Sequence, residues 1–426
     1  MNPQRVQASA LFYAVVVVLL VGSVVGGIIL LTHHRNQLAE RWLVHERVAS
    51  NARSAAHLAL SRSGPEATEE FIDLFGEGTD SAAVRWTAWG GLDLVHARAW
   101  YADQQATVAA FAGRHFDDAL VLDLARRAGT LHLCGDARLH GDVRVAQADV
   151  RRGHIEGRPF SGERLVEGAI HRATETTTTL RSDLEERVRR LCAGLAFQAE
   201  RIVTDAADPG PPWSGDPQEP LPVLLYHGAT HLDHVDLRGP LIIRCDDSLS
   251  IGTSAALDLV IIQAPFIAVD PGAAFSAQCF ATTAIVIGEG AQLHFPSMLA
   301  VCRDERRSEA ALIDVGEDVA VHGAVILLDR SVRDRSGGGL VIHPRAEVHG
   351  EVFVEGGVQH QGLVTGTLVA REMVLRTPAS MYHGHLLDGI LRPYTFGEPR
   401  GFGCSHQATE RTLLQWAPVT HGTVIG

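Results

Sequence analysis

A nine-residue pattern recurs along this chain, and its clearest copy is Ile287-Gly-Glu-Gly-Ala-Gln-Leu-His-Phe295. Two similar copies follow it, Val315-Gly-Glu-Asp-Val-Ala-Val-His-Gly323 and Ile342-His-Pro-Arg-Ala-Glu-Val-His-Gly350. Looser copies begin at Val269 and Cys245, and a further clear copy begins far upstream at Leu133. Each copy reads as an apolar residue, two variable residues, a turn residue, a small or aliphatic residue, a polar residue, an apolar residue, and then His or Ser, often followed by Gly.

The pattern has a direct physical interpretation. Alternating apolar positions place their side chains on one face of a strand, and Gly and Asp suit a sharp corner between short strands. A single copy cannot bury its own apolar face, but a stack of copies can. The copies start at uneven intervals, as turns with loops inserted at some corners do. The sequence therefore predicts a mainly β chain built around a parallel β-solenoid (β-helix).

Composition narrows the function classes. The chain has 426 residues, of which 46% are apolar and 20% charged, which suits two or three folded domains. The net charge of −13 argues against nucleic acid as a partner, because phosphate binding needs a basic surface. The six Cys residues include no CxxC pair, which argues against zinc ribbons and thioredoxin-like motifs. Cys134, Cys245 and Cys279 lie in strand-like runs as small apolar residues, and the sequence leaves a disulfide open.

The N-terminal segment from Val6 to Thr32 carries no charge. A helix needs about 20 apolar residues to cross a bilayer, and this run exceeds the ~7–15 apolar residues of a signal peptide. We therefore expect an uncleaved, single-pass anchor. The Arg residues on either side lean slightly towards a cytoplasmic C-terminal side, but large folded segments translocate regardless of local charge.

The same N-terminus carries a resemblance. The run Gln4-Arg-Val-Gln-Ala-Ser-Ala-Leu-Phe-Tyr-Ala-Val-Val-Val-Val-Leu-Leu20 resembles the start of PilX-type minor pilins and pseudopilins, with a short basic tail, small residues and then an aliphatic helix. The resemblance implies an anchor in the inner membrane of a bacterial envelope, with the bulk of the chain periplasmic or extracellular. It also implies envelope or pilus-like assembly proteins as partners. It covers only the N-terminal part of the chain, because ordinary pilins have no β-solenoid.

Two helical segments follow the anchor pattern. Apolar residues at three- and four-residue spacings extend the first helix as a stalk: Leu38, Trp42, Leu43, Ala49, Ala52, Ala56 and Leu60. This stripe packs either on partner helices or on the chain's own domain, and we favour its own domain. A second, amphipathic helix is predicted over 181–204, with its apolar stripe formed by Leu184, Val188, Leu191, Leu195 and Ile202.

The chain divides at its composition changes. Residues 1–62 form the transmembrane anchor and stalk helix, and 63–179 form a small β domain with short strands and solenoid-like turns. Residues 180–222 hold the second helix and a Pro-rich linker, and 223–376 form the main β-solenoid. Residues 377–426 form a C-terminal cap, since an exposed end strand recruits other chains.

The candidate chemistry lies in the repeated His. His140, His294, His322 and His349 hold the same position in their copies. Stacked turns lie ~4.8 Å apart, so that His322 and His349 are positioned to form a ladder that binds a metal or titrates near neutral pH. The alternative, which we favour, is that each is a corner residue with its ring in solvent. No catalytic, cofactor-binding or metal-ligating residue is therefore assigned.

We predict a membrane-anchored, non-enzymatic structural or assembly component of the bacterial envelope, either pseudopilin-like or a scaffold. The first alternative is an anchored carbohydrate-active or acyl-transfer enzyme on the same solenoid, for which Asp246-Asp247 and Asp329-Arg330 supply charged pairs. The second is a polymer-forming protein similar to bactofilins, whose Gly-and-Val repeats resemble Val348–Val354 and Gly362–Val369. A fold alone does not decide among these functions.

Overall fold

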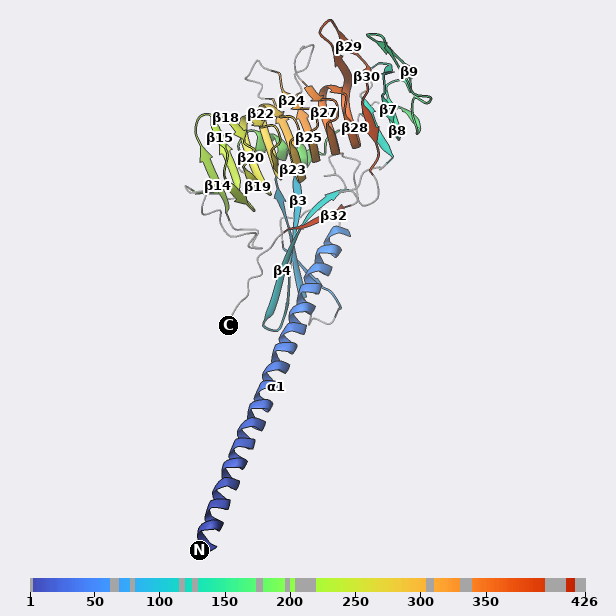
Figure 1. The fold of residues 1–426 in the computed structure, drawn as a ribbon. Helices are drawn as coiled ribbons and strands as arrows, with labels where there is room; N and C mark the ends of the chain where they lie inside the picture. The colour runs from blue at the N-terminus through green and yellow to red at the C-terminus, as the bar shows by residue number, and fades with distance from the viewer. Residues whose placement is uncertain are drawn as a thin grey trace.

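The computed structural model describes residues 3–61, 69–76, 81–114, 119–124, 129–173, 179–195, 200–203, 220–303, 310–329, 339–394 and 411–417, with side chains from residue 10 onward. The protein is mainly β with one long apolar N-terminal helix, which confirms the general fold class (Figure 1). Several parts of the sequence lie outside the described residues, namely most of the Pro-rich linker, Arg330, part of the predicted C-terminal cap and the sixth cysteine, Cys404.

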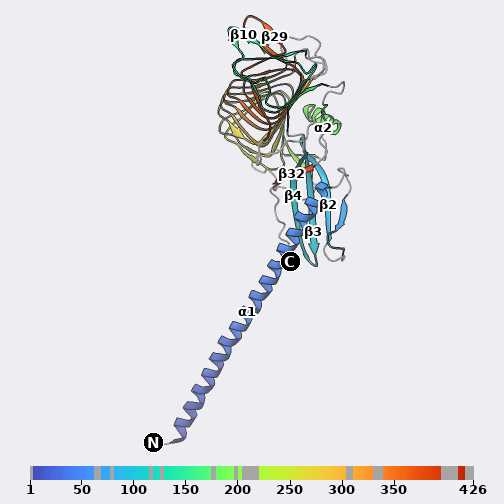
Figure 2. The ribbon, with the colours of Figure 1, turned by 90° about the vertical axis from the view of Figure 1, so that its right-hand side faces the viewer.

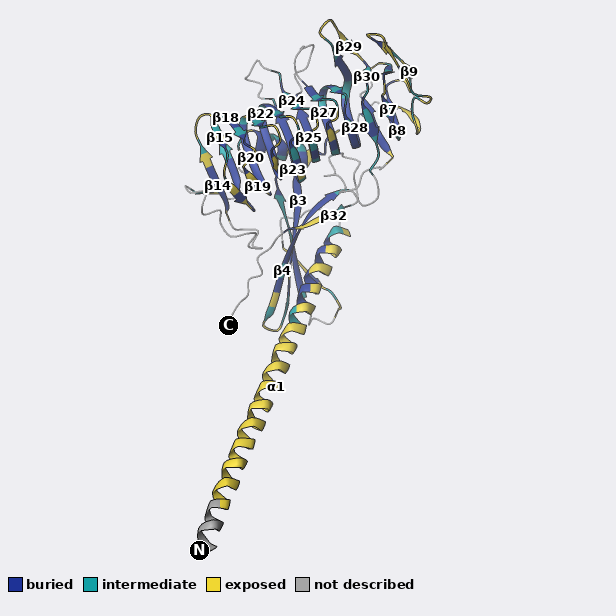
Figure 3. Cartoon of the chain, viewed as in Figure 1, coloured by how far each residue is buried: buried dark blue, intermediate teal, exposed yellow. Residues whose placement is uncertain are grey.

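Helix α1 (Pro3–Ser61) is unbroken. Its apolar part is long and apolar enough to cross a membrane and is not buried by any described part of the chain, as Figure 3 shows. The 22 residues from Ala10 to Leu31 have a helical length of about 33 Å at ~1.5 Å per residue, close to the hydrocarbon thickness of a bilayer. The segment therefore suits a single membrane anchor or a signal sequence.

The C-terminal third of α1 packs on an antiparallel sheet. The sheet order is β1 (Glu70–Asp73), β2 (Ser81–Trp89), β3 (Leu92–Tyr101), β4 (Gln104–Arg114) and β32 (Arg411–Ala417). The helix residues that pack there are small and buried, namely Val48, Ala49, Ala52, Ala55, Ala56 and Ala59. This confirms packing on the chain's own domain for the later part of the stripe. Leu38, Trp42 and Leu43 are exposed instead, because the sheet does not extend that far along the helix (Figure 2).

Residues 81–114 form long strands rather than the short strands predicted. Trp89 pairs with Leu92 across a Gly90-Gly91 turn, and Tyr101 pairs with Gln104 across the next turn. Two-residue turns of this kind join antiparallel strands when a residue takes positive φ, and Gly90 has φ of 60°. The Gly-Gly pair between two alternating runs was a hairpin signal in the sequence.

Most remaining strands form one closed sheet of mainly parallel pairs. We use "parallel body" for the described parts of residues 119–172 and 200–392. Its central strands in chain order are β13 (Glu200–Val203), β14 (Leu221–Tyr226), β15 (Thr230–Leu232), β17 (Ile242–Cys245), β18 (Ser248–Ile251), β20 (Val260–Val269), β21 (Ala274–Phe275), β22 (Ala277–Ile287), β23 (Gln292–Cys302), β24 (Leu312–Val315), β25 (Ala320–Leu328), β26 (Gly339–Ile342), β27 (Glu347–His360) and β28 (Leu363–Arg376). A short parallel pair, β16 (Asp236–Arg238) and β19 (Ala256–Asp258), lies beside them.

The recurring sequence copies lie in register. Val269 pairs with Ile287, Ile287 with Val315, and Val315 with Ile342. The turn residue of these four copies has positive φ in each case: Gly272 (77°), Gly290 (70°), Asp318 (57°) and Arg345 (62°). The copy placed at Cys245 was out of register, because Ile251 is the residue that pairs with Val269. The hydrogen-bonded turn at the corner therefore recurs where the pattern placed it.

The segment 119–172 joins the far end of the parallel body. It contains β5 (Leu120–Leu124), β6 (Leu131–Cys134), β7 (Arg138–Leu139), β8 (Asp142–Val145), β9 (Val150–Arg152), β10 (His154–Ile155), β11 (Arg158–Pro159) and β12 (Ile170–Arg172). There it meets the C-terminal strands β29 (Met381–His383), β30 (His385–Leu387) and β31 (Ile390–Arg392). Strand β5 pairs with β28, β6 with β30 and β7 with β31, all parallel. The described residues of the predicted domain 63–179 thus divide between the antiparallel sheet and this end of the body.

Helix α2 (Ser182–Cys192) is shorter than the predicted helix over 181–204. The Leu195 N–H donates to the Arg190 carbonyl, and the Gly194 N–H donates to the Leu191 carbonyl. Gly194 has φ of 69°, which completes a Schellman-type helix end. Residues 200–203 then form β13, and Ile202 is exposed. Gly194 therefore ends the helix, although the apolar stripe of the sequence continues to Leu195 and Ile202.

One side chain joins the antiparallel sheet to the parallel body. The Gly91 N–H donates to Gln278 Oε1 (2.7 Å), and Gln278 Nε2 donates to the Trp89 carbonyl (3.1 Å). Gln278 lies on β22 and is buried. A Cβ added at Gly90 would lie 2.0 Å from Gln278 Oε1. The hairpin turn therefore needs glycine both for its backbone angle and for this close approach.

We predict that Gln278→Met destabilises the fold by about 2–5 kcal/mol, since it keeps the side-chain volume but removes two buried hydrogen bonds. Urea unfolding of the full chain in detergent micelles, followed by tryptophan fluorescence, measures the effect. The half-buried Gln292→Met on β23 is the matched control. Equal unfolding midpoints for the two variants would contradict the role of Gln278.

Candidate functional site

The repeated His residues lie along one corner of the parallel body. His322 pairs in register with His349, which pairs with Thr365, and Thr365 pairs with Arg392. The His140 N–H donates to the Leu391 carbonyl, so His140 continues the same column. His294 precedes His322, but the register shifts between Leu293 and Ser297. We call His322, His349, Thr365, Arg392 and His140 the corner column.

His322 and His349 form the ladder that the pattern allowed. Their rings stack with centroids 4.6 Å apart and an interplanar angle of 6°. The interpretation that we favoured, a ring in solvent, is wrong for His349, whose side chain is only 15% exposed. His349 Nε2 lies 2.9 Å from a Glu347 carboxylate oxygen, and His140 Nδ1 lies 2.7 Å from that of Glu167. Among the described residues no group of three or more His, Cys, Asp or Glu is arranged to hold a metal ion. The imidazoles of the corner column thus contact one another or a carboxylate.

A second pair of stacked imidazoles was missed. His132 on β6 and His385 on β30 stack with centroids 4.7 Å apart and an angle of 15°. Burial, followed by repulsion from His385, lowers the pKa of His132. No local signal links the two residues, because they meet only through pairing of strands far apart in the sequence.

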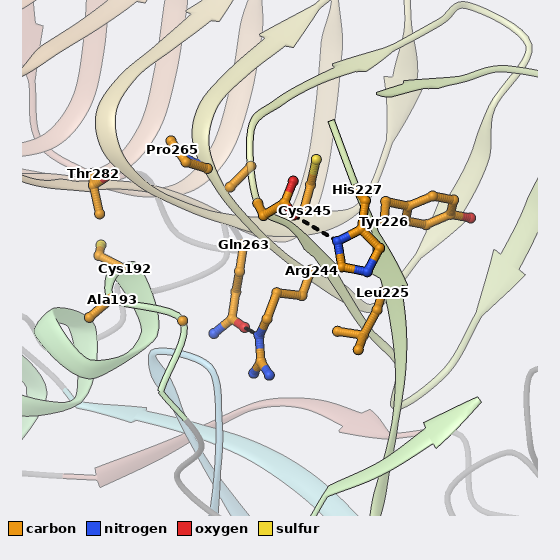
Figure 4. A pocket seen from close by; sticks show the side chains of 13 residues that line it. Cys192, Ala193, Leu225, Tyr226, His227, Arg244, Cys245, Gln263, Pro265 and Thr282 are labelled. Atoms are coloured by element: carbon orange, nitrogen blue, oxygen red, sulfur yellow. Dashed lines mark hydrogen bonds and ion pairs between the residues drawn. The ribbon is translucent and has the colours of Figure 1, made fainter. Parts of the chain in front are cut away.

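A pocket of about 350 Å³ lies beside the end of α2 (Figure 4). Its walls come from α2 and from β14, β17, β20 and β22. The residues that line it are Cys192, Ala193, Gly194, Leu225, Tyr226, His227, Arg244, Cys245, Asp246, Gln263, Ala264, Pro265 and Thr282.

Arg244 is held in place by its neighbours in this pocket. Its Nη atoms donate to the two Glu200 carboxylate oxygens at 2.8 and 3.0 Å, and its Nε donates to Gln263 Oε1 at 2.8 Å. Gln263 Nε2 in turn donates to the Leu191 carbonyl at the end of α2 (3.0 Å). The network joins four elements, α2, β13, β17 and β20, so the guanidinium serves first as a structural link.

Asp246 and Asp329, one residue from each charged pair that the enzyme alternative used, also have partners. Asp246 lies 2.7 Å from His227 and accepts the Gly228 N–H, and the His227 contact is the largest factor that lowers the pKa of Asp246. Asp329 is buried and lies 3.5 Å from Arg303. Burial raises the pKa of Tyr226 at the pocket rim. The contacts of Asp246 and Asp329 thus hold a corner and a strand end of the body in place.

The most strongly perturbed imidazole lies in the body itself. His360 on β27 is fully buried, and its Nε2 donates to the Ile390 carbonyl (3.1 Å). Its Nδ1 atom is buried with no hydrogen-bond partner among the described residues. Burial therefore lowers the pKa of His360 from 6.5 to about 4, because a second ring proton would have no acceptor.

This pKa predicts a pH dependence of stability. The unfolded chain binds a proton at His360 near pH 6.5, whereas the folded chain binds it only near pH 4. The stability from neutral His360 is therefore complete above pH 6.5 and is lost as the pH falls towards 4, by about 3 kcal/mol. His360→Gln should flatten this part of the profile in thermal unfolding, whereas His154→Gln at an exposed position should not. A profile unchanged in His360→Gln would count against the assignment.

Comparison with known proteins adds no relative. No family model matches the chain, and neither the curated proteins nor the solved structures compared with it include a match. The function must therefore be argued from the geometry above.

Proposed function

We propose that this chain is a membrane-anchored, non-enzymatic structural component of the bacterial envelope that assembles with other envelope proteins through α1, as pseudopilins do. The anchor lies in the inner membrane, and the remainder is periplasmic or extracellular. We propose further that the parallel body is a β-solenoid. The observation that carries the assembly proposal is that α1 is one continuous helix in two different surroundings. Its first part is exposed and apolar, and its last part packs on the antiparallel sheet.

The two parts of α1 differ in side-chain size as well as exposure. From Leu11 to Leu31 the large aliphatic side chains are exposed, which suits lipid contact. From Val48 to Ala59 the buried side chains are mainly alanines that lie against Ala82, Ala97, Ala99 and Ala110 of the sheet. Small residues on both surfaces allow close packing of the helix on the sheet. The anchor is thus continuous with the folded part, without an intervening linker.

A short apolar patch lies between these two parts. Leu38, Trp42 and Leu43 are 52%, 62% and 61% exposed. We call these three residues the helix patch. Arg35, Glu40, Arg41, Glu46 and Arg47 surround it with charges of both signs. An amphipathic helix that carries both an apolar patch and both signs of charge is suited to contact a similar helix. Large exposed apolar side chains near the end of the span mark an interaction site.

The β-solenoid proposal is supported by the registers of the body. The seventh residues of five copies, Phe275, Leu293, Val321, Val348 and Leu139, lie on one continuous line of pairs. Val364 and Leu391, which belong to no copy, complete the line between Val348 and Leu139. All seven residues are buried in one apolar cluster. Each turn therefore covers the apolar face of the next, as stacked repeats do.

The pocket supports assembly over an enzyme. A hydrolase or acyl transferase needs a nucleophile or base free to reach substrate. Arg244 is engaged by Glu200 and Gln263, so its guanidinium is already occupied. The Cys245 thiol donates to the Gly228 carbonyl at 3.2 Å. The guanidinium and the thiol of the pocket are thus both used in structural contacts.

We predict that a photo-crosslinking amino acid at position 42 gives adducts with another envelope protein in intact cells. Trp42 is exposed beyond the proposed span, whereas Leu58 is only 41% exposed on the part of α1 that packs on the sheet. The same amino acid at position 58 is therefore the matched control. Leu43→Arg should weaken recovery of the partner roughly tenfold, a change of about 1.4 kcal/mol.

Two results would contradict the assembly proposal. One is recovery of the chain alone from gently solubilised membranes, with no adduct at position 42. The other is an equal set of adducts at positions 42 and 58, which would indicate random contact.

The orientation is tested separately with a reporter enzyme that is active only outside the cytoplasm. Strand β32 returns the chain to the antiparallel sheet, so a C-terminal fusion reports the side on which that sheet lies. We expect an active fusion. An inactive but full-length fusion would place the folded part in the cytoplasm.

A further inference from the structure

Helix α2 is the connection between the two ends of the parallel body. Before it, β12 pairs with β8 at the far end, and after it, β13 pairs with β14 at the opposite end. Figure 1 shows β8 and β14 at the two ends of the body, and Figure 2 shows α2 on its outer side. Leu184, Val188 and Leu191 are buried against that outer side. The helix is therefore a strap whose position depends on how it is held to the body.

The strap ends at a cysteine. Cys192 is the last residue of α2, and the Gly194 turn fixes where the helix stops. Its Sγ donates to the Ala300 carbonyl of β23 at 3.6 Å. Cys192 is only 5% exposed, so it faces the body and not solvent.

A second cysteine lies opposite. Cys302 is the last residue of β23 and is 6% exposed. Side chains two apart on a strand share a face, and Ala300 and Cys302 both belong to the apolar cluster that α2 covers. Because the Cys192 thiol contacts the Ala300 carbonyl, Cys302 on the same strand face is its neighbour. After burial, Cys302 is the next factor that raises the pKa of the Cys192 thiol. The remaining described cysteines lie in other clusters: Cys245 and Cys279 inside the body, and Cys134 at its far end.

We propose that Cys192 and Cys302 are a disulfide-forming pair that joins α2 to β23 when the folded part is on the oxidising side of the membrane. The role of the compartment rests on the proposed function, whereas the pairing rests on the geometry alone. Disulfides persist in the periplasm and outside the cell, and are rare in the cytosol. The pair closes a long loop of the chain, which is the case in which a crosslink restricts the unfolded chain most.

The chemistry balances with a thiol–disulfide oxidant. One cysteine thiolate attacks a sulfur of the oxidant's disulfide, which forms a mixed disulfide and releases one oxidant thiolate. The second cysteine thiolate then attacks the protein sulfur of the mixed disulfide and releases the other. The Cys192–Cys302 bond forms, the oxidant's bond breaks, and the two thiol protons pass to the released thiolates. The protein sulfurs are oxidised and the oxidant sulfurs are reduced.

The burial of both cysteines indicates when the disulfide forms. The folded structure hides both sulfurs, and burial raises the pKa of the Cys192 thiol, so the reactive thiolate is scarce once α2 is in place. The bond therefore forms during folding, before the strap covers β23. Once formed, it is shielded from reductants in solution.

The deciding experiment uses the purified full chain in detergent micelles. The folded part is unfolded in urea and refolded with a mixture of oxidised and reduced glutathione. Free thiols are then blocked with a maleimide at acidic pH, and the linked peptides are identified by mass spectrometry. We expect a Cys192–Cys302 linkage, with the other four of the six cysteines labelled.

Two variants sharpen the result. Cys302→Ser should leave Cys192 labelled, and Cys245→Ser should leave the linkage intact. Refolded protein with all cysteines labelled, or with Cys192 linked to a different cysteine, would overturn the pairing. Neither result bears on assembly through the helix patch.

The same labelling on chain trapped by acid directly from cells separates the pairing from the compartment. A Cys192–Cys302 linkage in the refolded chain and in the chain from cells supports both the pairing and the exported location. A linkage in the refolded chain alone supports the pairing and contradicts the exported location in the proposed function.

Discussion

The parallel body depends on one constraint, which is the left-handed residue at each corner. Gly272, Gly290, Asp318 and Arg345 occupy the same place in successive copies. Asp318 and Arg345 are not glycines, so their positive φ is energetically unfavourable. Arg345 donates through Nε and Nη2 to the two Asp318 carboxylate oxygens, at 2.8 Å each, so the side chains of adjacent corners are joined. Once the corner is fixed, a shift of one residue would turn every apolar side chain outward. This register also fixes which side chains lie in the corner column and which lie on the outer face that contacts α2.

Much of the body could be predicted from the sequence, because the corner signal is local. The turn residue and the apolar seventh position follow from the repeated pattern. The pattern also allowed the His322–His349 stack, although we favoured rings in solvent. The location of residues 119–172 could not be predicted, since it depends on contacts such as Thr367 Oγ1 with the Leu120 carbonyl, 247 residues apart. The His132–His385 stack was missed for the same reason. The end of α2 was predicted too far along the chain, because the apolar stripe continues to Leu195 and Ile202 whereas Gly194 ends the helix.

The antiparallel sheet has two unlike faces, and this difference explains its place in the molecule. One face carries Ala82, Ala97, Ala99 and Ala110 and receives the alanines of α1. The other carries Trp89, Leu92, Leu94 and Phe111, and joins the cluster that contains α2 and the outer side of the parallel body. Strand alternation separates the two sets. The small residues bring a helix close, whereas the large ones fill the wider space beneath a curved surface.

The contacts between sheet and body make the orientation of the body relative to the anchor a property of the fold. Gln278 holds the turn of the β2–β3 hairpin. Next to that turn, Arg187 of α2 donates to the Leu92 carbonyl and to the buried Asp93 carboxylate at 3.1 and 3.0 Å. A buried carboxylate that loses its partner is costly, so the strap and the hairpin are held together. A protein tethered only to be retained at a membrane needs just a flexible linker. These buried polar contacts instead set the direction in which the body points relative to α1, as the proposed role in an assembly requires.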